Sequence, residues 1–161
     1  MKKICYIAIC FVCWGCNLQG SPDCFQSTGE IIQQEFNVEP FKDIIVFERV
    51  KLFISEGRGY NVTVETGDNL INEVKVVVED SILKLKDNNS CNFVRDYETT
   101  KVFVTAPNLE RIRNSSGSTV ENIGPLTFKR LSLISEDQFI EDEFHIDGDF
   151  DLDQLDVSTL T

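Results

Sequence analysis

The sequence is poor in residue types on which enzyme sites commonly rely. Among its 161 residues there is one histidine, His145, and one tryptophan, Trp14, which lies near the N-terminus. A serine or cysteine nucleophile needs a basic partner, most often histidine, and His145 stands in an acidic stretch with no nucleophile motif beside it. No glycine-rich phosphate-binding loop occurs either. We therefore expect a protein that is not an enzyme, without catalytic residues and without a cofactor.

Basic residues are also scarce. Lysine and arginine total 15 against 27 aspartates and glutamates, so the net charge is -12, and no lysine or arginine follows Arg130. Such a chain repels the phosphate backbone of DNA and RNA, and this excludes nucleic acid as the expected partner.

The N-terminus lacks a hydrophobic run long enough to span a membrane. The apolar run at residues 4–14 follows Lys2 and Lys3 and has eleven residues, whereas about 20 are needed to cross a bilayer. This pattern is typical of a signal peptide. Gly15-Cys16 then resembles the lipobox of bacterial lipoproteins, although Cys13 stands where that motif prefers leucine. The resemblance implies cleavage before Cys16 and lipid attachment to it; an ordinary secretory signal or an uncleaved anchor is the alternative.

The chain is expected to have three parts. Residues 1–15 form the signal peptide, residues 16–29 a tether rich in small and polar residues, and residues 30–161 the domain. Two further cysteines, Cys24 and Cys91, remain after the signal and the lipidated cysteine are set aside. An oxidising compartment would allow them to form one disulfide, with two free thiols as the alternative.

Residue alternation predicts β-strands throughout the domain and no helix of ten residues. Apolar and polar residues alternate with period two, as in half-buried strands, around residues 60–65, 74–79, 83–86 and 102–104. Turn residues separate these segments.

The second half of the domain contains a repeat. Residues 108–116, 127–135 and 151–159 align at spacings of 19 and 24 residues, which superposes Leu109 on Phe128 and Arg111 on Arg130. A period of about twenty residues predicts a β-solenoid in which each turn packs on the next. A β-sandwich with similar strands is the alternative.

Several short motifs, in order along the chain, resemble the head GIN domain family of bacterial auto-transporter adhesin-type lipoproteins. They lie at residues 41–46, 50–54, 62–70, 83–85, 106–109 with Ile112, and 115–118. The resemblance covers residues 30–161 and implies a right-handed parallel β-helix that acts as a surface or periplasmic module. It carries over no catalytic residue. Because the family domain usually continues through more rungs, we expect this chain to be truncated at its C-terminus.

An acidic tract offers a weak calcium site. Asp147, Asp149, Asp151 and Asp153 occupy every second position, so one face of a strand would carry all four carboxylates and the other Phe150 and Leu152. Calcium could bridge such a ladder of oxygens, yet the spacing fits no EF-hand loop. The alternative is a solvated face that discourages pairing between sheet edges.

Three functions remain open. The first is a lipid-anchored module at the outer membrane that binds a glycan or protein at the cell surface. The second is a periplasmic structural or signalling lipoprotein without its own ligand. The third is a polysaccharide-active β-helix enzyme that uses Arg111 and Arg130; loss of acidic-glycan turnover on replacing either arginine would identify it.

Overall fold

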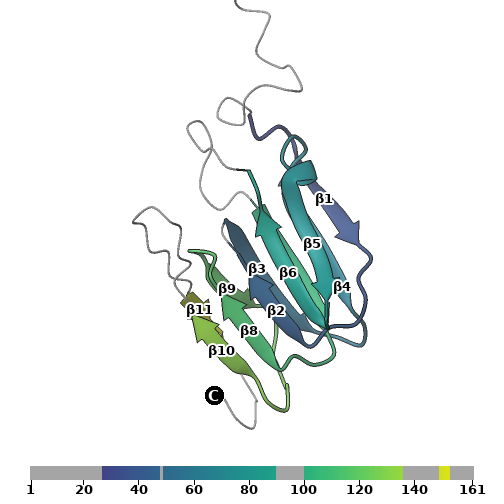
Figure 1. Ribbon diagram of the computed structural model, residues 1–161, viewed down its shortest axis with the longest axis vertical. Coiled ribbons are helices and arrows are strands. Elements are labelled where there is room, and N and C mark those ends of the chain that lie inside the picture. Colours follow the sequence, from purple (N-terminus) through teal and green to yellow (C-terminus); the bar gives the residue numbers. More distant parts are fainter. Residues whose placement is uncertain (1–26, 48, 90–99, 136–148, 153–161) are drawn as a thin grey trace, which may run out of the picture.

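The computed structural model describes residues 27–47, 49–89, 100–135 and 149–152, and these form two β-sheets (Figure 1). The six-stranded sheet has the order β1 (Ile31–Phe36), β4 (Asn61–Gly67), β7 (Thr100–Ala106), β3 (Val50–Glu56), β9 (Thr119–Asn122), β11 (Asp149–Asp151). The five-stranded sheet has the order β10 (Ser132–Ser135), β8 (Arg111–Asn114), β2 (Asp43–Val46), β6 (Ile82–Asp87), β5 (Val74–Glu79). A short 3-10 turn, η2 (Ile71–Glu73), precedes β5. No helix able to cross a membrane occurs in the described part of the chain.

Strand alternation builds one hydrophobic core between the sheets. In β3, Val50, Leu52 and Ile54 are buried while the residues between them are partly exposed. The same alternation in β4, β6 and β7 turns valine and leucine side chains inward, and all of them belong to one cluster with residues of β2 and β8. The two sheets therefore pack face to face, and each keeps a second face toward solvent.

The prediction of an all-β chain holds for the described residues, but the prediction of a right-handed parallel β-helix is wrong. Both sheets are mixed: β4 runs antiparallel to β1 and β7, and β5 runs antiparallel to β6. The described residues form no closed solenoid. The packing of two separate sheets is nearer to the sandwich alternative.

The hairpin between β5 and β6 supplies one physical reason for the mixed arrangement. Two residues, Asp80 and Ser81, join these strands, and both have positive φ angles of 51° and 63°. Such a turn reverses the chain directly, whereas parallel neighbours need a crossover of a dozen residues or more. The solenoid prediction required a parallel connection at this point.

The repeat units pair, but in a different register from the predicted one. Ile112 of β8 lies opposite Leu133 of β10, an offset of 21 residues rather than 19. Arg111 is accordingly paired with Ser132, and Arg130 is exposed and lies outside the strand. The predicted stacking of Arg111 on Arg130 is therefore wrong. The third unit lies outside the described residues except for Asp151 and Leu152, so its pairing with the second unit stays a prediction.

Candidate binding faces of the two sheets

The predicted site residues lie mostly outside the described residues. Cys16, Cys24 and Cys91 are among these, so lipid attachment and the disulfide stay predictions. Asp147 and Asp153 of the proposed calcium ladder are outside as well. His145 and the C-terminal residues after Leu152 share this position.

The described part of the acidic ladder agrees with the predicted alternation. Asp149 and Asp151 belong to β11, Asp151 is exposed, and Phe150 and Leu152 pack against the core. Within the described ranges, no group of three or more histidine, cysteine, aspartate or glutamate side chains is placed to hold a metal ion. Calcium binding by the ladder stays untested.

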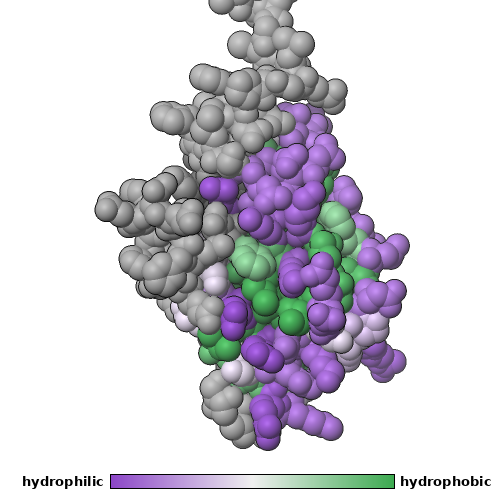
Figure 2. Space-filling model, in the orientation of Figure 1, coloured by the Kyte–Doolittle hydropathy of each residue, from purple (hydrophilic) through white to green (hydrophobic). Residues whose placement is uncertain are grey.

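The outer face of the five-stranded sheet is rich in basic side chains, and we call it the basic face. Its outward strand positions carry five cations and two carboxylates: Lys75, Lys84, Lys86, Arg111 and Arg113, with Asp43 and Glu79. Apolar side chains stand between them, and Figure 2 shows a hydrophobic area in the middle of this side of the molecule, bordered by hydrophilic residues. A chain with net charge -12 thus concentrates positive charge on one sheet face.

One cross-strand row on the basic face alternates apolar and cationic residues over all five strands. Strand register places Val77, Lys84, Ile45, Arg113 and Ile134 in line from β5 to β10. Because neighbouring strands lie about 4.8 Å apart, Lys84 and Arg113 are separated by about 10 Å, with Ile45 between them. We call this line the central row.

Two ion pairs fix part of the basic face. Arg111 Nη2 lies 2.9 Å from Asp43 Oδ2, and Lys84 Nζ lies 2.5 Å from Glu79 Oε2. These are pairs between adjacent strands or within one hairpin, and they hold the side chains of Arg111 and Lys84 in defined positions. They neutralise both carboxylates of the face, and Lys75 and Lys86 remain as an excess of positive charge on it.

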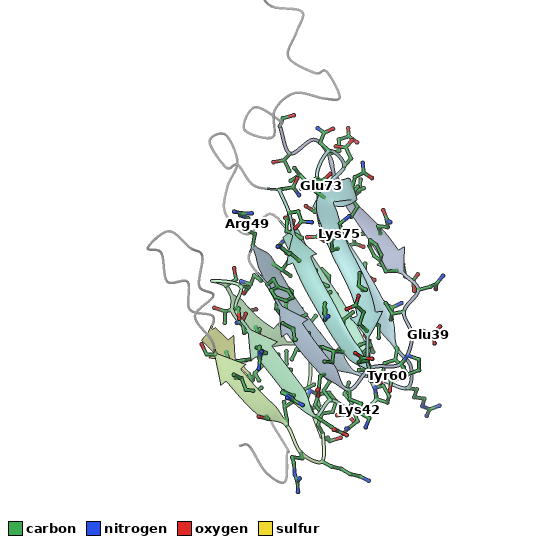
Figure 3. All side chains as sticks on the ribbon, in the orientation of Figure 1. Glu39, Lys42, Arg49, Tyr60, Glu73 and Lys75 are labelled. Atoms are coloured by element: carbon green, nitrogen blue, oxygen red, sulfur yellow. The ribbon has the colours of Figure 1, made fainter. Side chains whose placement is uncertain are left out.

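Lys75 and Lys86 form a like-charge pair beside the central row. They lie directly opposite each other on β5 and β6, and both are exposed. Figure 3 marks Lys75 on β5. No carboxylate among the described residues forms an ion pair with either lysine. Like charges directly opposite on an antiparallel pair are destabilising, so this position costs the isolated protein stability.

The outer face of the six-stranded sheet, which we call the acidic face, contains the corresponding pair in a neutralised form. Lys51 and Lys101 lie opposite each other on β3 and β7. Lys51 Nζ is 2.9 Å from Glu121 Oε1, and Lys101 Nζ is 3.1 Å from Glu65 Oε1. Two further carboxylates, Glu35 and Asp151, occupy outward positions on the same sheet. Charge is therefore segregated between the two faces of the molecule.

A phenylalanine pair stands at the centre of the acidic face. The rings of Phe53 and Phe103 are stacked, with centroids 5.0 Å apart and an interplanar angle of 14°. Lys51 Nζ lies 5.6 Å from the Phe53 centroid, within range of a cation–π contact. Since the stacked rings turn their faces toward each other, they present mainly edges to solvent, and this favours a structural role for the pair.

Hydrogen bonding perturbs one carboxyl group on the acidic face. The amide of Gln33 donates a hydrogen bond of 2.9 Å to Glu65 Oε2, and Lys101 bonds the other oxygen. Both partners favour the charged carboxylate, so the pKa of Glu65 lies below its ordinary value of 4.5. The Glu65 carboxylate on β4 therefore links this strand to Gln33 on β1 and to Lys101 on β7.

Sequence reasoning missed the basic face because the face depends on which strands are neighbours. The outward positions of Lys84 and Lys86 followed from their alternation with Leu83 and Leu85. Lys75 lies opposite Lys86 because of the two-residue hairpin, which the sequence analysis did not identify, and nothing in the sequence placed Arg113 beside Ile45. A count of the outward cations in each predicted strand would have suggested a basic surface. It would not have shown that these strands lie in one sheet.

The comparisons with known proteins identify the family. The family model described as "Putative auto-transporter adhesin, head GIN domain" matches residues 40–161. The search of curated proteins gave no match.

Solved structures share the fold. A putative adhesin from Bacteroides fragilis has a TM-score of 0.65 at 21% identity, over 81% of this chain and 56% of that one. A putative adhesin from Parabacteroides distasonis has a TM-score of 0.54 at 16% identity, over 82% of this chain and 60% of that one. A putative lipid binding protein from the same species has a TM-score of 0.51 at 15% identity, over 65% and 46%. This chain thus spans about half the length of the structures it resembles.

The solved structures show a shared fold, and the description of the family model is that of an adhesin domain. Because the match covers most of the chain, the protein belongs to the head GIN domain family.

Proposed function

We propose that this chain is a non-catalytic adhesion module that a lipid on Cys16 holds at the outer membrane of a bacterial cell. Membership of a family described as an adhesin domain carries the proposal. The basic residues, short apolar run and Gly15-Cys16 at the N-terminus support the anchor. Two acyl chains on one cysteine would give stable attachment, whereas a single chain binds membranes only weakly.

The way in which the tether joins the domain supports this arrangement. Asp68 N donates to Glu30 O at 2.8 Å, Glu30 N donates to Asp68 Oδ1 at 3.1 Å, and Asn69 Nδ2 donates to Ser27 O at 3.1 Å. Residues 27–30 are therefore bound to the turn that follows β4. An anchored chain would enter the domain at this point.

The strands lead away from that entry point. Figure 3 shows Glu73, close to the turn after β4, at one end of the molecule, and Lys42 and Tyr60 at the other. Both sheet faces extend along this direction between the two ends. In an anchored protein they would be accessible from the side, which suits a module that binds a partner on a broad, flat surface.

The anchor is tested by metabolic labelling with radioactive palmitate. Wild-type protein should incorporate label and partition into the membrane fraction, and a Cys16→Ala variant should do neither. Cys13→Ala serves as the matched control, because it leaves Cys16 in place and should label normally. Equal labelling of wild type and Cys16→Ala would contradict the proposed anchor.

The location is tested by protease shaving of intact cells, with immunodetection of residues 30–161. Loss of the domain from unbroken cells is the expected result. Protection until the outer membrane is opened would place the domain in the periplasm. The adhesion proposal would then be dropped in favour of a structural or signalling lipoprotein.

The enzyme alternative loses its main argument. It needed Arg111 and Arg130 on adjacent rungs, whereas Arg111 pairs with Asp43 and lies opposite Ser132. The two arginines therefore do not form the paired basic groups that a polysaccharide-active site would need.

A further inference from the structure

Each face of the molecule carries two lysines directly opposite each other, and among the described residues only one of these pairs has glutamate partners. Lys51 and Lys101 face each other across parallel strands, and each has a glutamate within ion-pair distance. Lys75 and Lys86 face each other across antiparallel strands, and within the described ranges neither has one. A repulsive pair that is left exposed on an otherwise acidic chain indicates that a negatively charged partner supplies the missing counter-charge.

We propose that the basic face binds an anionic polysaccharide that lies across the strands along the central row. Lys75, Lys86 and Arg113 would contact its acidic groups, while Ile45 and Val77 pack against the apolar faces of the sugar rings. The proposal rests on the adhesion function proposed above, and it names the chemical class of the ligand.

The spacing of the central row fits a repeating polymer. Lys84 and Arg113 stand two strands apart, about 10 Å, on either side of Ile45. An acidic polymer that lies along this line would meet both cations, Lys84 beside its Glu79 partner, and would place the sugar between them over the isoleucine. Guanidinium groups are well suited to carboxylates and sulfates because they can donate two parallel hydrogen bonds.

The relative heights of the side chains favour a polysaccharide over a membrane surface. Insertion into a bilayer requires apolar side chains that reach beyond the charged ones. Here Ile45 and Ile134 are half-buried, and the longer lysine and arginine side chains flank them. Val77, at the end of the row, is 40% exposed. Charged side chains border the other apolar residues of the row, which suits contact with a polar polymer strand better than insertion among acyl chains.

The test uses the full chain in a nonionic detergent and measures binding of fluorescently labelled polygalacturonate fragments by anisotropy. Wild-type protein should bind the polygalacturonate and not labelled dextran, which is neutral. Affinity should fall as salt is raised, because the contacts are exposed and electrostatic.

Two double variants make the test specific to one face. Lys75→Gln with Lys86→Gln should weaken binding roughly tenfold, since two exposed charge contacts are lost. Lys51→Gln with Lys101→Gln removes the same charge from the acidic face and should leave affinity within about twofold of wild type. Circular dichroism during thermal unfolding shows whether both variants stay folded. A single Ile45→Thr variant tests the apolar contact and should weaken binding without altering its salt dependence.

Three results would overturn the proposal. Equal weakening by the two double variants would mean that net charge alone attracts the polymer. Displacement of polygalacturonate by phosphatidylglycerol added to the micelles would assign the face to lipid headgroups. No binding by folded wild-type protein would rule out an anionic polysaccharide as the ligand of the basic face. None of these results affects palmitate labelling or protease shaving, so failure of this inference is distinguishable from failure of the proposed function.

Discussion

Thr100 Oγ1 donates a hydrogen bond of 2.6 Å to Asp87 Oδ2, and this bond joins the first residue of β7 in one sheet to the last residue of β6 in the other. Thr66 Oγ1 lies 2.9 Å from Thr100 Oγ1 and must be the donor there, because the single hydroxyl proton of Thr100 is already used. Asp87 is only 4% exposed. A buried polar contact thus links the sheets beside the apolar core.

We expect Thr100→Val to lower the free energy of unfolding by about 1–3 kcal/mol. The substitution keeps the side-chain shape but takes a donor from a buried carboxylate, which is costly to leave with fewer partners. Chemical denaturation gives the value. Thr105→Val is the control: its hydroxyl bonds Ser55 Oγ on the solvent side, so a change within about 0.5 kcal/mol is expected. Similar losses in both variants would contradict the special role of the buried bond.

The stacked phenylalanines should be energetically coupled. A double-mutant cycle with Phe53→Leu and Phe103→Leu should give a coupling energy of about 0.5–1.5 kcal/mol, because leucine keeps much of the apolar area and loses the ring contact. Urea unfolding of the four proteins provides the data. Additive effects of the two substitutions would show that the stacking contributes nothing beyond area burial.

Acid should remove the stabilisation that Glu65 provides. Its pKa is lowered in the folded protein, chiefly by the hydrogen bond from Gln33 and then by Lys101. The stabilisation is therefore fully present above the unfolded-state pKa and is lost as the pH falls through the folded-state pKa. Glu65→Gln should make stability less steeply dependent on pH between about pH 5 and 3. Gln34→Ala, next to Gln33 on β1, should leave the wild-type slope unchanged.

Lys86→Glu should stabilise the isolated protein. It replaces a like-charge pair opposite Lys75 by an opposite-charge pair, for an expected gain of about 0.3–1 kcal/mol at low salt. Lys101→Glu should have the opposite effect, because it breaks the ion pair with Glu65 and places a second carboxylate there. Thermal unfolding at two salt concentrations checks both, since salt should shrink each difference. Destabilisation by Lys86→Glu would remove the argument that Lys75 and Lys86 repel each other.

The hairpin tip offers a stabilising substitution of another kind. Ser81 has a φ angle of 63°, a region that glycine enters without the steric cost of a side chain. Ser81→Gly should therefore raise the free energy of unfolding by up to about 1 kcal/mol. Gly124→Ala is a control in the opposite direction. The φ angle of Gly124 is 78° and a new Cβ would meet open space, so the substitution should lower the free energy of unfolding only through the backbone cost of a side chain at positive φ. A loss of stability in Ser81→Gly would mean that its hydroxyl does more than the backbone angle suggests.

The sequence determined which segments form strands and which side chains face the core. Alternation in β4, β5, β6 and β7 located these strands within one or two residues of their ends. It also placed Phe150 inward and Asp151 outward on β11. The ordered motifs identified the family, which the family match then confirmed. The edge strand β1 was missed because Ile31-Ile32-Gln33-Gln34 shows no clean alternation.

Strand register and partnership were decided only by the tertiary structure. Leu131 and Leu133 are both apolar and two residues apart, so a shift of two residues leaves the inward pattern of β10 unchanged. A shift of one residue would expose the core face, but a shift of two has no such cost, and the repeat alignment could not detect it. Which sheet each strand joins depends on packing across the whole core. That packing placed β2 between β8 and the β5–β6 hairpin, and so brought the cations of β8 onto the same surface as those of the hairpin.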